Sequence, residues 1–197
     1  MTTSDLRRTV ERVASTLTNL GIRFHLTGGL ASSFYGEPRT TRDADFVVRL
    51  GAREARSLVR DLSRDFLINA SSVQEAVRHN GMFQALDQET MIKVDFHVGE
   101  LIGGELGRSR PQELFGGLVV PLVSKEDAIL SKLIWIRDGS DRSRSDVLGM
   151  LMDPGECDMS FVRERAAKMG CAGILGTLET NALKQPGTTE TDGGPVV

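Results

Sequence analysis

The chain has 197 residues, of which 40% are hydrophobic and 26% charged, and its formal net charge is −3. This composition is typical of a globular protein with one good-sized core and excludes a uniformly basic nucleic-acid binder, although it allows a local basic patch. The two cysteines, Cys157 and Cys171, lack zinc-ligand spacing and are too few for a disulfide scaffold. The sequence lacks both an apolar signal core and a run of roughly 20 apolar residues that could cross a bilayer. We therefore expect a soluble, cytoplasmic protein without membrane contact.

The first part of the chain alternates between helical and strand-like hydrophobic patterns. Apolar residues at helical spacing from Leu6 to Leu20 predict an opening helix that stops at Gly21. The pattern then predicts, in chain order, a strand over 22–26, a short helix over 30–35, a strand over 43–50, a helix over 52–62, a hairpin of strands over 82–86 and 90–98, a glycine-rich loop over 101–110 and a short strand over 118–122. These elements indicate an α/β (α+β) fold with a small mixed β-sheet and flanking helices.

From Ser124 onward the pattern becomes helical. Ser124 and Asp127 resemble a capping box for a helix through Ile136, in which Trp135 is expected to be part of the core. Further helices are predicted over 146–152, 158–169 and 172–183. The last residues are rich in proline, glycine, threonine and acidic residues and have nothing to bury. The predicted organisation is a core over 1–123, a helical extension over 124–183 and a disordered tail over 184–197.

Three aspartates lie on the polar faces of two predicted strands. Asp43 and Asp45 are two residues apart, so their side chains share one face, and Asp95 lies on the polar face of the later strand. If the two strands are neighbours, the three carboxylates meet at one place and repel one another unless cations neutralise them or protons stay bound. Hard oxygen ligands select Mg²⁺ or Mn²⁺, and Mg²⁺ commonly joins carboxylates to substrate phosphates. The pattern predicts a metal site at Asp43, Asp45 and Asp95.

Upstream of the aspartates, Thr27-Gly28-Gly29 follows a predicted strand and opens a predicted helix. Glycines at such a turn let the backbone approach a phosphate, and the helix N-terminus presents free N–H groups to the anion. A lone Gly-Gly pair is usually only a turn, and a lone Asp-x-Asp pair is usually a solvated strand edge. The order of the motifs, a glycine turn followed by a carboxylate pair and a third carboxylate on a later strand, favours a site for a metal-bound phosphate.

These motifs resemble the nucleotidyltransferase signature of the DNA polymerase β superfamily. The segments that carry the resemblance are Leu26-Thr27-Gly28-Gly29, Asp43-Ala44-Asp45-Phe46-Val47 and Val94-Asp95-Phe96. The stretch from Thr27 to Val48 is similar to the bacterial AbiEii-type toxin nucleotidyltransferases and their relatives, and the similarity continues over about residues 5–180. The chain departs from the family pattern at two places. Many superfamily members have Gly-Ser where this chain has Gly28-Gly29, and Ser143 and Gly149 stand where the toxin group often has a second acid.

The resemblance implies a role for each motif. Its catalytic residues would be the three aspartates, which bind metal, and two residues of the helical extension: Asp43, Asp45, Asp95, Lys132 and Asp146. Asp95 would also help to activate the attacking hydroxyl, Lys132 would contact phosphate, and Asp146 would orient that lysine or a second group. Residues around the glycine turn and the aspartate pair are expected to bind the nucleotide: Thr27, Gly28, Gly29, Arg39, Arg42 and Lys132. Simpler roles stay open, because Lys132 could face solvent, Asp146 could stabilise a helix start, and the two arginines could balance nearby acids.

The implied activity is the metal-dependent transfer of a nucleoside monophosphate from a triphosphate such as ATP to a hydroxyl, with release of pyrophosphate. An RNA end, such as a tRNA acceptor end, is the favoured acceptor. A protein side chain, such as that of a partner antitoxin, follows, and a small molecule comes third. A stretch with three arginines (Arg137, Arg142 and Arg144) either contacts an RNA backbone or is an exposed linking loop. The alternative is a catalytically silent nucleotidyltransferase fold that acts as a binding or regulatory module; the glycine in place of serine favours it, and the three intact aspartates count against it.

Overall fold

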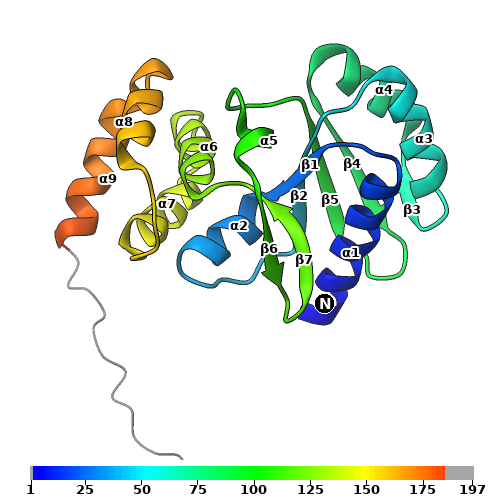
Figure 1. Cartoon of the computed structure of the whole chain (residues 1–197), viewed down its shortest axis with the longest axis horizontal. Coiled ribbons are helices and arrows are strands. Elements are labelled where there is room, and N and C mark those ends of the chain that lie inside the picture. Colours follow the sequence, from blue (N-terminus) through cyan, green and yellow to red (C-terminus); the bar gives the residue numbers. More distant parts are fainter. Residues whose placement is uncertain (1, 185–197) are drawn as a thin grey trace, which may run out of the picture.

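The computed structural model describes residues 2–184 of the chain (Figure 1). Its helices are α1 (Thr3–Asn19), α2 (Gly28–Tyr35), α3 (Ala52–Leu62), α4 (Ala70–His79), α5 (Glu105–Arg108), α6 (Lys125–Arg137), α7 (Arg142–Met152), α8 (Met159–Lys168) and α9 (Ala172–Lys184). Its strands are β1 (Phe24–Thr27), β2 (Asp43–Val48), β3 (Phe66–Ile68), β4 (Met82–Asp87), β5 (Lys93–Val98), β6 (Arg110–Leu114) and β7 (Leu118–Leu122). Lys184 ends α9 rather than beginning a tail, and the rest of the predicted disordered tail lies outside the described residues.

A single mixed sheet organises the described part of the chain, with the strand order β3-β4-β5-β2-β1-β7-β6. The central strands β2 and β5 are parallel neighbours, and β1 pairs antiparallel with β2 and parallel with β7. Antiparallel pairs complete both edges. The sheet confirms the predicted α/β class, and it makes direct neighbours of the two strands that carry the aspartates.

One face of the central strands is apolar and packs against α1, α3 and α4, which gather on one side of the molecule in Figure 1. Ala44, Phe46 and Val48 alternate along β2 and are fully buried, as their period of two predicts. Phe46 and Phe83 both stack on Phe96, with ring centroids 5.8 Å and 4.7 Å away. Each such buried side chain contributes about 1.5 to 3 kcal/mol to stability. The polar residues between them are thereby directed to the opposite face.

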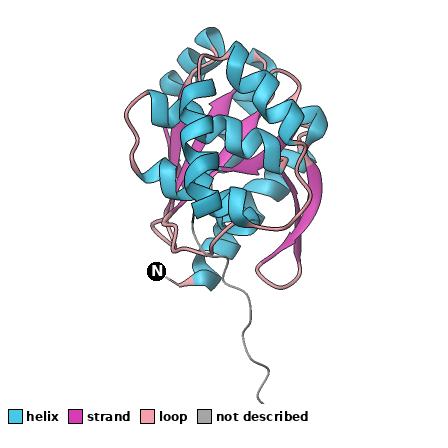
Figure 2. Cartoon of the chain, turned by 90° about the vertical axis from the view of Figure 1, so that its left-hand side faces the viewer, coloured by secondary structure: helices cyan, strands magenta, loops and turns pink. Residues whose placement is uncertain are grey.

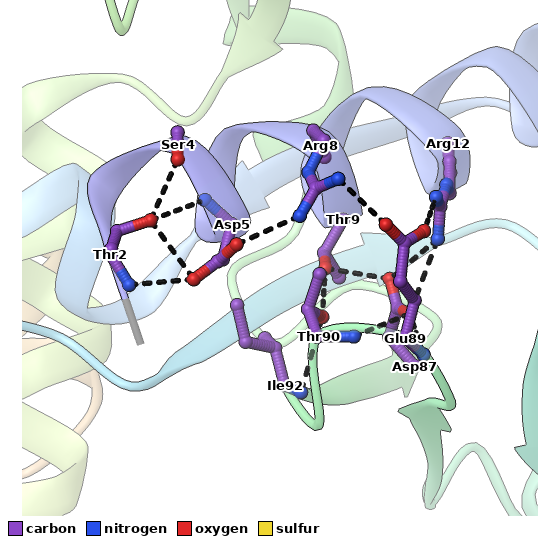
Figure 3. A network of polar contacts seen from close by, with 10 residues as sticks. All are labelled: Thr2, Ser4, Asp5, Arg8, Thr9, Arg12, Asp87, Glu89, Thr90 and Ile92. Carbon is purple, nitrogen blue, oxygen red and sulfur yellow. Dashed lines mark hydrogen bonds and ion pairs between the residues drawn. The ribbon is translucent and has the colours of Figure 1, made fainter.

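A polar network ties α1 to the turn between β4 and β5 (Figure 3). The hydroxyl of Thr9 donates to the buried carboxylate of Asp87 at 2.7 Å, and Arg12 donates to Asp87 and to Glu89. The backbone N–H groups of Glu89 and Thr90 also donate to Asp87. Burial alone would raise the pKa of Asp87, but these hydrogen bonds and the charge of Arg12 outweigh it and lower the pKa. The network fixes the hairpin that carries β5.

Helices α6–α9 pack together beside the sheet and lie in front of it in Figure 2. Helix α2 joins the two parts, because it contacts β1 and β2 as well as α6 and α7. At the α2–α7 contact the backbones meet closely: a Cβ on Gly36 would lie 2.8 Å from the backbone of both Gly149 and Met150. A single cluster of buried apolar residues runs through both parts, and the division near residue 123 stays a prediction. No helix within residues 2–184 is long and apolar enough to span a bilayer.

Several elements differ from the sequence-based expectations. The segment after α3 forms β3 and α4, which we did not predict, although Asn69 caps α4 by accepting the N–H of Ser72. The predicted glycine-rich loop contains the four-residue helix α5 and leads into β6. β6 escaped prediction because it is a polar edge strand that contains Pro111, and an edge position tolerates a missing N–H.

Two expectations for the helical part were wrong. Helix α7 begins at Arg142 rather than at Asp146, because its first turn is polar and therefore carries no apolar period. Asp146 lies in the second turn of α7, so it does not stabilise the helix start. Trp135 is not part of the core, since 43% of it is exposed and it faces a cavity.

Candidate active site

The register of β2 and β5 brings the three predicted aspartates to one place. Asp45 lies directly opposite Asp95, and Asp43 lies opposite Lys93. Residues opposite one another in neighbouring strands are about 5 Å apart, and their side chains point to the same face. Asp95 is buried, whereas Asp43 and Asp45 are half-buried and line a cavity. The arrangement agrees with the expectation that the two strands are neighbours.

The charged form of the Asp45 carboxyl is electrostatically disfavoured. Burial, followed by the negative charges of Asp43 and Asp95, raises its pKa to about 6, although the charge of Lys132 opposes this change. A carboxyl that is penalised in this way gains from any cation that approaches it. The site is therefore prepared for positive charge from a ligand.

Lys93 lies beside the aspartates and supplies part of that charge. Its ammonium donates to Oδ2 of Asp95 at 2.7 Å and lies 4.0 Å from Oδ2 of Asp43. This hydrogen bond raises the pKa of Lys93, so the side chain is positively charged at neutral pH. The other oxygen of Asp95, Oδ1, is buried and has no hydrogen-bond partner among the described residues.

The donor set suits a hard divalent cation, which prefers carboxylate oxygens, and the partnerless Oδ1 of Asp95 is an oxygen that such a cation or a substrate hydroxyl would satisfy. The three carboxylates do not, however, form a ready-made cluster: within residues 2–184, no three His, Cys, Asp or Glu side chains are grouped as metal ligands. The Lys93 ammonium instead bridges towards two of the aspartates. A metal at this place would require that the lysine side chain turn away.

The glycine turn lies directly against the aspartates. Gly28 begins α2 with a φ of +64°, in the left-handed region that favours glycine, and a Cβ at this position would overlap the carboxylate of Asp45. The hydroxyl of Thr41 donates to Oδ1 of Asp43 at 2.8 Å and so orients the outer carboxylate. Thr27, Gly28 and Gly29 all line the cavity, so the N-terminus of α2 opens towards it.

Lys132 and Asp146 meet across the cavity from α6 and α7. Asp146 accepts two hydrogen bonds from the Arg39 guanidinium, at 2.7 Å and 2.9 Å. It also forms an ion pair with the Lys132 ammonium, at 2.8 Å. Burial alone would raise the pKa of Asp146, but the hydrogen bonds and charges of these two cations outweigh it and lower the pKa. Lys132 is therefore directed inward, and Asp146 holds two positive charges at the cavity wall.

Most of the residues described so far surround one cavity of about 220 Å³, but Asp95 and Lys93 lie outside its lining. Its lining is Thr27, Gly28, Gly29, Arg39, Asp43, Asp45, Val47, His97, Leu101, Glu105, Ser131, Lys132, Trp135, Ser140, Arg142, Ser143 and Asp146. Arg42 is exposed and lies outside this lining. Of the three arginines that end α6 and begin α7, Arg142 lines the cavity, whereas Arg137 and Arg144 pair with Asp138 and Asp141.

A family model described as the nucleotidyl transferase AbiEii toxin of type IV toxin–antitoxin systems matches residues 14–147. The match covers more than half of the chain and includes the glycine turn, the three aspartates, Lys132 and Asp146. The chain belongs to the AbiEii nucleotidyltransferase family. It is accordingly an enzyme of the nucleotidyltransferase class. Comparison with curated protein sequences gives no significant match.

Solved structures support the fold of this AbiEii protein. An antigenic nucleotidyltransferase-like protein from Paracoccidioides brasiliensis is 17% identical with a TM-score of 0.55, over 91% of this chain and 94% of the other. The antibiotic-resistance factor ANT(2'')-Ia in solution is 13% identical with a TM-score of 0.56, over 90% of this chain and 99% of the other. At such identities these similarities show a shared nucleotidyltransferase fold.

The structure gives a physical reason for one departure of this AbiEii protein from its family. Gly149 stands where the toxin group often has a second acid, and a Cβ there would lie 3.1 Å from the backbone nitrogen of Glu37. A side chain at Gly149 would require its neighbours to shift by a few tenths of an ångström, so the packing of α2 on α7 favours glycine at this position. Asp146 is already paired with two cations.

The sequence analysis assigned no role to Glu105, which lies on the cavity wall of this AbiEii protein. It is buried, accepts the N–H groups of Leu101 and Ile102 at Oε1, and places Oε2 3.7 Å from Nε2 of His25. Burial raises the pKa of Glu105 to about 7 and lowers the pKa of His25 to about 4. Burial therefore favours the uncharged form of both side chains, and both nitrogens of His25 lack a hydrogen-bond partner within residues 2–184. Nothing in the glycine-rich segment around Glu105 signals this position.

Proposed function

We propose that the chain transfers a nucleoside monophosphate from a triphosphate to a hydroxyl of an RNA end, in a reaction that depends on Mg²⁺ or Mn²⁺. The observation that carries the proposal is the placement of Asp45 opposite Asp95, directly against the left-handed turn at Gly28. This placement puts Asp45 beside a helix start suited to phosphate within one cavity, with the buried Asp95 paired to it just outside the lining.

The side chains divide the work of this reaction. The N–H groups at Gly28 and Gly29 would bind the terminal phosphates, and Lys132, held by Asp146, would neutralise their charge. A divalent cation held by the three aspartates would supply further positive charge at the transferred phosphate.

The proton of the attacking hydroxyl would pass to Asp95, which must first be uncovered by movement of Lys93, because Asp95 is buried and lies outside the cavity lining. The hydroxyl oxygen forms a bond to the α-phosphorus, the bond from that phosphorus to the leaving pyrophosphate breaks, and Asp95 retains the proton. Asp95 is thus the proposed general base for the acceptor.

RNA is the favoured acceptor because the exposed Arg142 lines the cavity and would contact an RNA phosphate, whereas Arg137 and Arg144 are paired with neighbouring aspartates. The family description as a type IV toxin supports a role as a toxin component with a partner antitoxin. A side chain of that antitoxin is the second acceptor to test.

The test is to incubate the protein with Mg²⁺, total cellular RNA and each of the four labelled nucleoside triphosphates in turn. The variant Asp43→Ala/Asp45→Ala removes the carboxylate pair, and Asp61→Asn, on α3 and outside the cavity lining, is a control for loss of an acidic charge. Label on RNA that persists in the control and disappears in the double variant supports the proposal. Label on protein instead identifies a protein acceptor. If no label moves and calorimetry detects no triphosphate binding, the proposal is wrong.

A further inference from the structure

The cavity continues beyond the aspartates into a region without phosphate-binding groups. One residue pair beyond the row of Asp45 and Asp95, the parallel strands place Val47 opposite His97. This step along the strands is about 6.6 Å. Leu101 and Trp135 also line the cavity, as does the buried carboxyl of Glu105, which accepts the N–H of Leu101. The cavity thus has apolar and aromatic side chains, and one buried carboxyl, in addition to its phosphate-binding groups.

Trp135 is exposed in this cavity, which is unusual for so large an apolar side chain. It is 43% exposed, and Leu101, which lines the same cavity, is 50% exposed. Exposed apolar groups that gather in a cavity are typical of ligand sites rather than of surface in general. The indole ring meets the His97 ring edge-on, with centroids 6.5 Å apart and an interplanar angle of 77°. The two rings therefore form an aromatic corner that opens to the cavity.

The position of this corner relative to the phosphate-binding residues identifies the kind of ligand. Trp135 follows Lys132 by three residues on α6, so the two side chains lie on neighbouring turns of one helix face. Across the cavity, His97 follows Asp95 by two residues on β5 and shares its face. On α6, Trp135 therefore lies next to Lys132, and on β5, His97 lies next to Asp95 along the same face. Each aromatic ring thus neighbours a residue with a proposed role in nucleotidyl transfer. A nucleotide has this order of chemistry, in which a planar ring follows the phosphate after one sugar.

We propose that Trp135 and His97 form a subsite for a nucleobase, which stacks on the indole. The inference rests on the proposed nucleotidyl transfer and extends it to the part of the substrate beyond the phosphates. The base could belong to the donor triphosphate or to the acceptor RNA, and the two sources share the same stacking chemistry. Stacking tolerates every base, so this subsite adds affinity without strict base selection.

Trp135 is the single tryptophan of the chain, so its fluorescence reports this subsite alone. The experiment titrates the protein, in the presence of Mg²⁺, with each nucleoside triphosphate, with a short single-stranded RNA that lacks a triphosphate, and with inorganic tripolyphosphate. Calorimetry on the same samples measures binding independently of the indole. Base-bearing ligands should quench the emission, and tripolyphosphate should bind without quenching. Quenching by triphosphates assigns the donor base to the subsite, and quenching by RNA alone assigns the acceptor base.

Two variants measure the contribution of the ring. Trp135→Ala should lower the affinity for the ligand that quenches the emission by roughly 5- to 150-fold, the range expected for loss of one stacked base. The affinity for tripolyphosphate should stay unchanged. Trp135→Phe, which keeps an aromatic face, should retain most of the affinity. Nucleotide or RNA binding that neither changes the emission nor weakens in Trp135→Ala would overturn the subsite while the proposed function stands. Failure of triphosphate, RNA and tripolyphosphate alike to bind would overturn both.

Discussion

Replacing Glu105 by glutamine removes one titratable proton from the cavity wall and keeps the shape of the side chain. The amide oxygen of glutamine can accept the N–H groups of Leu101 and Ile102, as Oε1 of Glu105 does at 2.6 Å and 3.2 Å. The amide NH₂ would then face Nε2 of His25, which has no partner among the described residues. The substitution therefore changes the charge of the buried pair with little change in its packing.

The magnitude follows from the pKa of Glu105, which burial raises from 4.5 to about 7. The unfolded chain loses this proton first as the pH rises, so the native state loses stability between about pH 4.5 and pH 7. The full loss is about 3 kcal/mol, since one pKa unit corresponds to about 1.4 kcal/mol. His25 acts in the opposite direction, because its pKa is lowered from 6.5 to about 4, and stability is lost as the pH falls through that range. The two effects partly cancel in the native protein.

The assay is urea unfolding of the native protein and of Glu105→Gln at pH 4.5, 6 and 8, followed by circular dichroism. The difference in unfolding free energy between the two proteins cancels the titration of groups distant from Glu105, whereas His25, in contact with the substituted side chain, is followed separately by repeating the comparison in a His25→Ala background. We expect this difference to shift in favour of the variant by about 3 kcal/mol from the lowest to the highest pH. A difference that stays constant with pH would refute the reasoning that Glu105 is held protonated by burial.

Three further predictions concern the site itself. Gly28→Ala forces a residue with a Cβ into the left-handed region and against the Asp45 carboxylate. The variant should lose about 1 to 2 kcal/mol of stability in thermal melts and should lower the rate of transfer at least about 100-fold. Full activity would contradict the close packing of Gly28 against Asp45. Asp146→Ala leaves Arg39 and Lys132 without their shared anion and should destabilise the protein by about 3 kcal/mol in urea unfolding, with part of the loss recovered in Asp146→Ala/Arg39→Ala. Chelation with EDTA should abolish transfer and added Mg²⁺ or Mn²⁺ should restore it; transfer that persists in excess chelator would speak against the proposed metal.

The part of the site on the sheet could be predicted because strand geometry leaves a simple trace in sequence. A period of two along 43–48 and 93–98 separates buried apolar residues from the aspartates, so the shared face of Asp43 and Asp45 follows from spacing alone. The pairing of β2 with β5 does not follow from either pattern, because the alternation of apolar and polar residues within a strand does not depend on which strand lies next to it. For that step, the resemblance to a known family was needed.

The rest of the site depends on contacts between distant segments, which leave no local trace. Arg39 and Asp146 are separated by 107 residues and meet only because α2 packs on α7. Glu105 lies in a four-residue helix, too short to show a helical period. Trp135 is a large apolar residue of the kind expected in a core, and only the position of α6 beside the cavity shows that its side chain faces outward.

The close contact between Gly36 and Gly149 also has a consequence for how the protein is made. A ribosome releases the chain from its amino terminus, so the glycine turn and all three aspartates emerge before α6 and α7 exist. Until the segment that ends near Gly149 has been synthesised, α2 has no partner on one side, and Lys132 and Asp146 cannot complete the cavity wall. A chain interrupted before that point carries the acidic motif without the cavity wall, so a working site forms only after α7 has been made.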